Sequence, residues 1–346
     1  MVCLEHPQGT KTMTIPTAKI QRSQSDVCML IDRLVQAIAC TSQPAFIIAK
    51  TVSGVEEIKC TKLSWYFDSI YQMVNLFVGQ QDYTYAESLQ VFWQACQEIG
   101  LEYSPFGFTC LNEGENQYLS YHDAMNKLVS HIRQLLDVGP YKRRKDDRIY
   151  ESNQKRESIT AYCNEVLDQY SRTVVVRVNL YYHKFARARL RVEHVFEDLE
   201  RLAKERGRNP IFNFEIGYIC GVEQGKDMGF HIHAAFFFNG AKVRSDYAKA
   251  REIGALWTEI TEGRGFWHSS NDEKLSYGSD LGVGTIRRDD ALLRAGCIKA
   301  MHYLVKDTQP LLIRPRRGRV LRKGVKPSRS ASQSIHCSEA HVASLV

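Results

Sequence analysis

The sequence predicts an α/β (α+β) protein in which an antiparallel sheet, flanked by helices, follows a mainly helical N-terminal domain. Residues 214–223 and 230–238 have the pattern of two hairpin arms, which predicts the antiparallel sheet. Residues 26–137 instead carry apolar side chains mostly at helical spacing. We therefore divide the chain into a flexible N-terminus (1–25), a helical domain (26–138), a basic linker (139–157), an α/β domain (158–312) and a basic tail (313–346).

The helical domain shows the spacing of an ordinary buried core. Its Trp and Phe side chains recur at helical intervals, which is typical of core residues, so we assign no chemistry to this half. The polar stretch before residue 26 is expected to be loose. Within the domain we expect helices at 27–38, 65–77, 85–93 and 121–136, and a strand at 45–52.

The linker is indicated by a change in composition. Gly139-Pro140 opens a polar, basic stretch of the kind that joins domains. Its side chains Lys142, Arg143 and Arg144 would contact the phosphates of a nucleic acid. A solvated hinge without a ligand explains the same composition equally well.

The α/β domain is predicted to open with a strand at 173–180. A long basic helix at 185–206 and a helix at 244–261 lie on either side of the hairpin. Residues 263–289 are rich in Gly, Ser and Asp, which favours an irregular loop or a short strand. His268 in this stretch is a spare metal-ligand candidate, and a surface histidine is the simpler interpretation.

Two histidines of the hairpin are predicted to project to one side. Residues i and i+2 of a strand share a face, so His231 and His233 point the same way. If the turn is centred on Asp227, Glu223 lies opposite His231 on that face. Two imidazoles and a carboxylate would bind a divalent cation, Mg²⁺ or Mn²⁺, beside a phosphate substrate. A His-x-His pair also arises by chance, and a register slip of one residue would separate the three groups.

A helix is predicted from Asp289 to Asp307, and one of its faces carries Lys299, Tyr303 and Lys306 at positions i, i+4 and i+7. A tyrosine between two lysines suits attack on a phosphodiester, because the cations stabilise the phenolate and the charge that develops on phosphorus. Tyr-x-x-Lys alone is a weak signal. An amphipathic helix with a half-buried tyrosine is the alternative.

The order of these motifs resembles the HUH endonucleases, which carry His-hydrophobic-His. Within that superfamily the chain looks like the filamentous-phage (inovirus-type) rolling-circle replication proteins and the prophage YagK/YfjJ-like group. The residues that carry the resemblance are Glu223, the segment Gly229-Phe-His-Ile-His233 and the segment Tyr303-Leu-Val-Lys306. The resemblance covers 158–312 and implies an HUH-type sheet there. In this group the tyrosine follows the histidines, as it does here.

The resemblance implies an enzyme that nicks DNA at a specific site to start replication. Tyr303 would form a covalent 5′-phosphotyrosine, with Lys306 and Lys299 as its cationic partners. Glu223, His231 and His233 would hold the cation. Single-stranded DNA or an extruded hairpin at a replication origin would be the substrate, and a host helicase a further partner. Two alternatives are a transposase of the same chemistry and a non-catalytic DNA-binding regulator. A histidine-triad nucleotide hydrolase would need another histidine, where Ala235 stands.

The tail carries the clearest electrostatic signal of the chain, whose net charge is +7. Such a block of like charge is expected to stay extended and to attract nucleic acid. A disordered tail that only aids solubility is the alternative. Its basic residues, with no acid among them, are Arg314, Arg316, Arg317, Arg319, Arg322, Lys323, Lys326 and Arg329.

The remaining features predict a protein of the bacterial host's cytoplasm, with no membrane partner. The ten cysteines are scattered without Cys-x-x-Cys spacing, which favours free thiols in a reducing compartment. No apolar run approaches the ~18 residues needed to span a bilayer. The first residues lack a basic region followed by an apolar one, so no signal peptide is expected.

Overall fold

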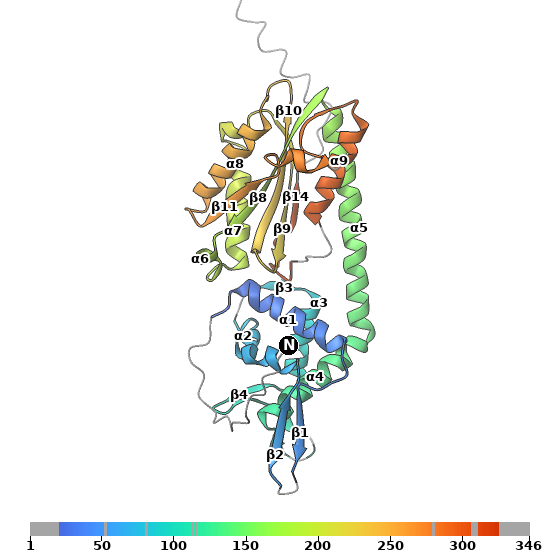
Figure 1. The fold of residues 1–346 in the computed structure, drawn as a ribbon, viewed down its shortest axis with the longest axis vertical. Coiled ribbons are helices and arrows are strands. Elements are labelled where there is room, and N and C mark those ends of the chain that lie inside the picture. Colours follow the sequence, from blue (N-terminus) through green and yellow to red (C-terminus); the bar gives the residue numbers. More distant parts are fainter. Residues whose placement is uncertain are drawn as a thin grey trace, which may run out of the picture.

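Three packed helices form the centre of the N-terminal unit in the computed structural model (Figure 1): α1 (Gln24–Ala39), α3 (Glu87–Glu98) and α4 (Tyr121–Asp137). The structure describes residues 21–51, 54–79, 82–112, 114, 116–278, 281–305 and 311–324. Around these helices lie the 3-10 helix η1 (Ser64–Ser69), α2 (Ile70–Asn75) and the two-stranded pairs β1 (Phe46–Lys50) with β2 (Glu56–Cys60), β4 (Glu102–Ser104) with β5 (Gly107–Thr109), and β6 (Leu111–Asn112) with β7 (Gln117–Tyr118).

The unit is mainly helical, as predicted, and β1 confirms the strand expected at 45–52. The start of the first helix differs from the prediction. Ser23 caps α1 through a hydrogen bond from the backbone N–H of Asp26, so the helix begins inside the segment predicted to be loose. Ser25 is buried, and its carbonyl and hydroxyl oxygens both accept hydrogen bonds from the side-chain amide of Gln224. This contact holds the first helix against the sheet. Residues 1–20 lie outside the described part of the chain.

An antiparallel sheet forms the second unit. Its strands lie in the order β11-β8-β10-β9-β14, and a further strand, β12, also pairs with β8. The predicted strand at 173–180 and both hairpin arms are confirmed. The bounds are β8 (Arg172–Tyr182), β9 (Glu215–Gly225), β10 (Gly229–Asn239), β11 (Gly265–Ser269), β12 (Gly284–Arg287) and β14 (Leu321–Lys323).

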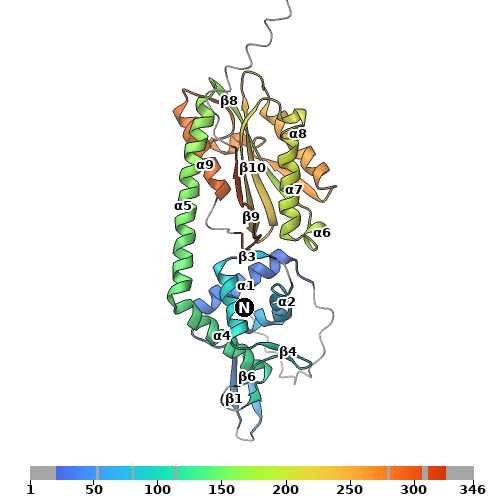
Figure 2. The same cartoon turned by 180° about the vertical axis from the view of Figure 1, so that it is seen from behind.

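Helices cover both faces of this sheet (Figures 1 and 2). On one face, Val176 and Phe236 pack into the core shared with α7 (Val192–Glu205) and α8 (Asp246–Ile260). The long helix predicted at 185–206 is divided into two helices in the structure, a short α6 (Lys184–Arg187) and α7. Two further short 3-10 segments are η2 (Pro210–Phe212) and η3 (Lys274–Ser276).

The opposite face is only half covered by apolar packing. Val175 and Phe237 pack there against α5 (Gly139–Asp168) and α9 (Ala291–His302). Strand side chains alternate between faces, so the odd-numbered residues further along β8 and β10 share this face. Apart from Ala235 these residues are polar, and those of β8 line a cavity with the last turn of α9 and with Tyr303, where the candidate site is found.

The basic stretch predicted to be a linker (139–157) is helical. It forms the first half of α5, a 30-residue helix that runs beside both units (Figure 2). Pro140 lies in the first turn, where its missing N–H costs no intrahelical hydrogen bond, so Gly-Pro marks a helix start here. Two basic side chains of this half form ion pairs, one of them within the helix, where Lys155 lies 3.5 Å from Glu151. Arg148 lies 2.8 Å from Glu87 of α3.

The tail, predicted to be extended from 313 onwards, is paired over its first residues. β13 (Ile313–Pro315) pairs with β3 (Tyr83–Tyr85) of the N-terminal unit, and β14 completes the edge of the sheet beside β9. Strand pairing satisfies backbone N–H and C=O groups that an edge strand would leave open, which outweighs the repulsion of the basic side chains. Residues 325–346 lie outside the described part.

Within the described ranges, none of the helices combines the length and the apolar character needed to cross a membrane.

Candidate metal centre

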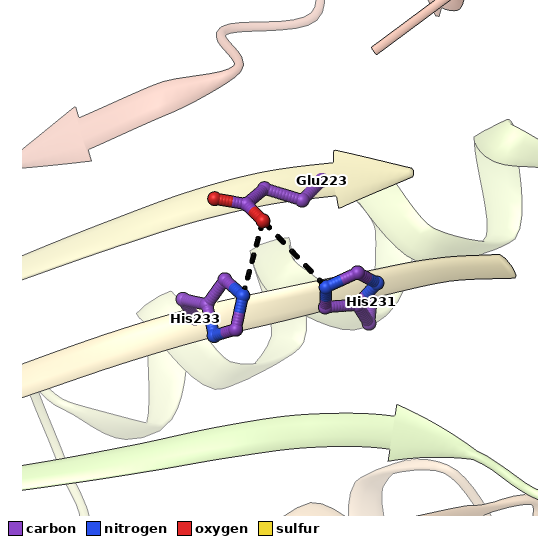
Figure 3. A group of neighbouring side chains, drawn as sticks. All are labelled: Glu223, His231 and His233. Carbon is purple, nitrogen blue, oxygen red and sulfur yellow. Dashed lines mark hydrogen bonds and ion pairs between the residues drawn. The ribbon is translucent and has the colours of Figure 1, made fainter. Parts of the chain in front are cut away.

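Three side chains converge on adjacent strands of the sheet (Figure 3). His231 is paired with Glu223, which confirms the predicted register, and Gly229 closes the turn in the left-handed region at φ 63°. Nε2 of His233 lies 3.1 Å from Oε2 of Glu223, and Nε2 of His231 lies 3.7 Å from the same oxygen. One ligand atom from each residue fits within 4.8 Å of the others. This spacing suits one cation held by all three.

The second nitrogen of each imidazole faces an oxygen. Nδ1 of His231 donates to the carbonyl oxygen of Gly229 at 2.9 Å, and Nδ1 of His233 donates to Oδ1 of Asn179 at 2.5 Å. When Nδ1 carries the ring proton, the lone pair of Nε2, on the Glu223 side, would be available to bind a cation. Asn179 is therefore a positioning residue that the sequence analysis missed. It lies on β8 directly opposite His233, and the β8–β10 register cannot be read from the sequence.

The carboxylate is suited to a cation. Glu223 is only 4% exposed, and its Oε1 is buried without a hydrogen-bond partner among the described residues. Burial alone would raise the pKa of Glu223, but its contacts with His231 and His233 and their charges lower that pKa to about 2. Glu223 is thus ionised at neutral pH. A buried anion with one unsatisfied oxygen is the environment that a divalent cation would complete.

Cation binding by these residues should weaken in acid. Burial lowers the pKa of His233 below its usual value, more than the charge of Glu223 raises it, so the imidazole is neutral at pH 7. We therefore expect a constant Mn²⁺ affinity near neutral pH, and then a loss of about tenfold per pH unit once the pH falls below the lowered pKa of His233. Titration calorimetry with Mn²⁺ at a series of pH values below 7 measures this loss of affinity. An affinity that does not fall in acid would rule out imidazole ligands.

The helix that carries the tyrosine ends earlier than predicted. α9 stops at His302, and Tyr303 opens the 3-10 segment η5 (Tyr303–Val305). The backbone of η5 packs closely against β9 at Gly221, where a Cβ would lie 2.4 Å from the carbonyl oxygen of Leu304. The predicted single face of Lys299, Tyr303 and Lys306 therefore does not continue along one helix. Lys306 lies outside the described residues.

Tyr303 lines a cavity next to the three ligands. The cavity has a volume of about 600 Å³ and is also lined by Lys299, Arg177 and Asn179. Asn179 forms part of its wall and hydrogen-bonds to His233, so the cavity borders the ligand set. Tyr303 is 44% exposed, in keeping with a side chain that a substrate can reach. His268, the spare ligand candidate, lies on the cavity wall with Nε2 3.0 Å from Glu273, outside the ligand group.

The predicted nucleic-acid-binding residues fall into three groups. Arg144, Arg314 and Arg319 line a cleft of about 640 Å³ between the two units, and Glu223 lies on the wall of the same cleft. Lys142, Arg143 and Arg317 are exposed. The other three contact the protein itself: Arg322 lies 2.6 Å from Glu200, Arg316 lies 3.3 Å from Asp82, and Lys323 donates to Ser158.

Residues 140–277 match the family model of the YagK/YfjJ C-terminal domain. The matched segment begins in α5 and includes the hairpin with all three ligands. It ends before α9, so the YagK/YfjJ match does not reach Tyr303. Neither the comparison with curated proteins nor that with solved structures gave a match.

Proposed function

We propose that this protein is a replication initiator of the HUH endonuclease type, encoded by a phage or prophage, which nicks DNA at a specific site to start rolling-circle replication. The observation that carries the proposal is the proximity of two features. Glu223, His231 and His233 converge on one point, and Tyr303 lines the cavity beside them. A cation site next to an accessible tyrosine is suited to nucleophilic attack on a phosphodiester.

In the proposed reaction, the Tyr303 hydroxyl oxygen attacks the scissile phosphorus. A bond from this oxygen to phosphorus forms while the bond from phosphorus to the 3′ oxygen breaks. The phenolic proton leaves, and the released 3′ oxygen takes up a proton. The DNA 5′ phosphate remains joined to Tyr303, and the free 3′ hydroxyl primes synthesis. A Mg²⁺ or Mn²⁺ ion held by Glu223, His231 and His233 would supply Lewis-acid polarisation of the phosphate.

The surroundings of the site favour a polyanionic strand as the substrate. Lys299 lines the same cavity as Tyr303, and four arginines line the cleft that Leu304 of η5 borders, together with four acidic residues. Contacts from such side chains to backbone phosphates bind DNA without regard to its sequence. We therefore propose single-stranded DNA or an extruded hairpin at an origin as the substrate, with a host helicase to open the duplex ahead.

The direct test is a search for the covalent intermediate. The purified chain is incubated with Mn²⁺ or Mg²⁺ and a pool of single-stranded oligonucleotides that includes origin sequences from the source replicon. We expect an adduct that survives denaturing electrophoresis, and mass spectrometry should map the nucleotide to Tyr303. A metal-free sample is the control. Tight, salt-sensitive DNA binding without an adduct would instead favour a non-catalytic DNA-binding regulator.

A further inference from the structure

One side chain of the cavity has no role in the proposed nicking reaction. Arg177 lies on β8, two residues before Asn179, so the two share the face that carries the ligands. The strand pairing places Arg177 opposite Ala235 and Asn179 opposite His233. Arg177 is therefore the neighbour, on the same face of β8, of Asn179, which orients His233. Arg177 also lines the cavity beside Tyr303.

Glu223 is the carboxylate whose charge acts on Arg177, and its Oε2 already contacts His231 and His233. Arg177 is half-buried, and its Nε is buried without a hydrogen-bond partner within the described residues. Burial lowers its pKa, and the nearby groups Tyr277, Glu223, Tyr181 and Tyr303 oppose that shift. An arginine remains protonated under these conditions. A partly desolvated cation that keeps an unused donor favours an anionic ligand in the cavity.

The rest of the cavity fits a nucleotide. Lys299 adds a second positive charge, and Glu273, the acidic side chain among the described lining residues, faces His268. Tyr181 and Phe266 are stacked with ring centroids 5.3 Å apart, and they present aromatic surface to the cavity. Aromatic faces of this kind stack on bases of any sequence, while cations bind the phosphate. The cavity thus has aromatic side chains to bind the base of a nucleotide and cationic side chains to bind its phosphate.

We propose that Arg177 is a phosphate ligand, which donates its guanidinium N–H groups to a non-bridging oxygen of the phosphodiester that Tyr303 attacks. The attached nucleotide occupies the cavity against Tyr181 and Phe266. Arg177 keeps its proton throughout and opposes the negative charge that develops on the phosphorus oxygens. This assignment rests on the proposed nicking function for the identity of the phosphate. The binding of a nucleotide by the cavity can be measured without it.

The test uses thymidine 5′-monophosphate as a probe, with its binding to the full chain measured by saturation-transfer NMR. We expect Arg177→Leu to weaken binding by about tenfold or more, because it removes a charge-assisted hydrogen-bond donor. Arg177→Lys keeps the charge but not the planar fork, so its affinity should fall between those of the wild type and Arg177→Leu. The control is Arg287→Leu, an exposed arginine of β12 outside the cavity lining that pairs with Asp289. It should bind as the wild type does.

The two proposals can fail separately. Equal nucleotide binding by the wild type and Arg177→Leu would overturn the ligand assignment, as would a wild type that binds no nucleotide. If Arg177→Leu does not fold, Arg177→Lys decides, and wild-type affinity in that variant overturns the assignment. An adduct formed at full rate by a folded Arg177→Leu variant would also overturn it while nicking stands. If nucleotide binding depends on Arg177 but no adduct forms, the cavity binds a nucleotide as proposed and the nicking function is wrong.

Discussion

Replacement of Tyr303 by phenylalanine is expected to abolish the covalent DNA adduct while DNA and Mn²⁺ binding remain. The variant removes one oxygen atom from a side chain that is 44% exposed and that takes no part in the strand pairing of the three proposed ligands. The free energy of unfolding should therefore change little. Since the hydroxyl oxygen forms the bond to phosphorus, its loss should lower the rate of adduct formation by about a thousandfold or more.

Tyr277 provides the matched comparison for this variant. It lines the same cavity and, like Tyr181, is a competing nucleophile. Tyr277→Phe should still give the adduct, as seen on a denaturing gel. If the adduct persists in Tyr303→Phe and disappears in Tyr277→Phe, Tyr277 is the nucleophile and the assignment of Tyr303 is wrong. Electrophoretic mobility shifts measured on both variants check that DNA binding is retained.

The hairpin with its ligands could be predicted because its information is local. Alternation along the two arms fixes which side chains share a face, and a short turn fixes the register between them. Glu223 thus lies opposite His231, as expected from the turn alone. The turn is closed by Gly229, whose positive φ suits glycine.

The rest of the site depends on contacts between distant segments. Asn179 reaches His233 across 54 positions of sequence, and Arg177 faces the cavity only because β8 pairs with β10 in one register. The pairing of β13 with β3 joins the end of the chain to its first unit in the same way. Local patterns cannot specify such pairings. The basic stretches therefore suggested a linker and an extended tail where the structure has a helix and two strands.

Gly-Pro at the start of α5 shows why composition misled the prediction. The same dipeptide marks a turn or the first turn of a helix, depending on the residues after it. Here the next residues are charged and are good helix formers, and Ile159 and Val166 further along bury one face against the sheet. Tertiary packing of that face selects the helix over an extended linker.

Replacement of His231 by alanine is expected to remove the cation and, with it, the nicking activity. Its Nε2 lies 3.7 Å from the Glu223 oxygen, and without it two ligands remain. Loss of a direct metal ligand usually costs more than the ten- to hundredfold loss seen for outer-shell partners, so we expect about a hundredfold or greater loss of Mn²⁺ affinity. The adduct should fall in parallel, and excess Mn²⁺ should restore part of it.

The control for this variant is His268→Ala, since His268 is a histidine of the same cavity wall that contacts Glu273 and lies outside the ligand group. It should keep wild-type Mn²⁺ affinity, measured by titration calorimetry. If both alanine variants bind Mn²⁺ equally, the cation site is not at the hairpin. If His231→Ala loses the metal but keeps the full rate of adduct formation, the cation supports the fold of the hairpin and takes no part in the chemistry. If Mn²⁺ affinity and the rate of adduct formation fall together, the site formed by Glu223, His231 and His233 takes part in the reaction at Tyr303.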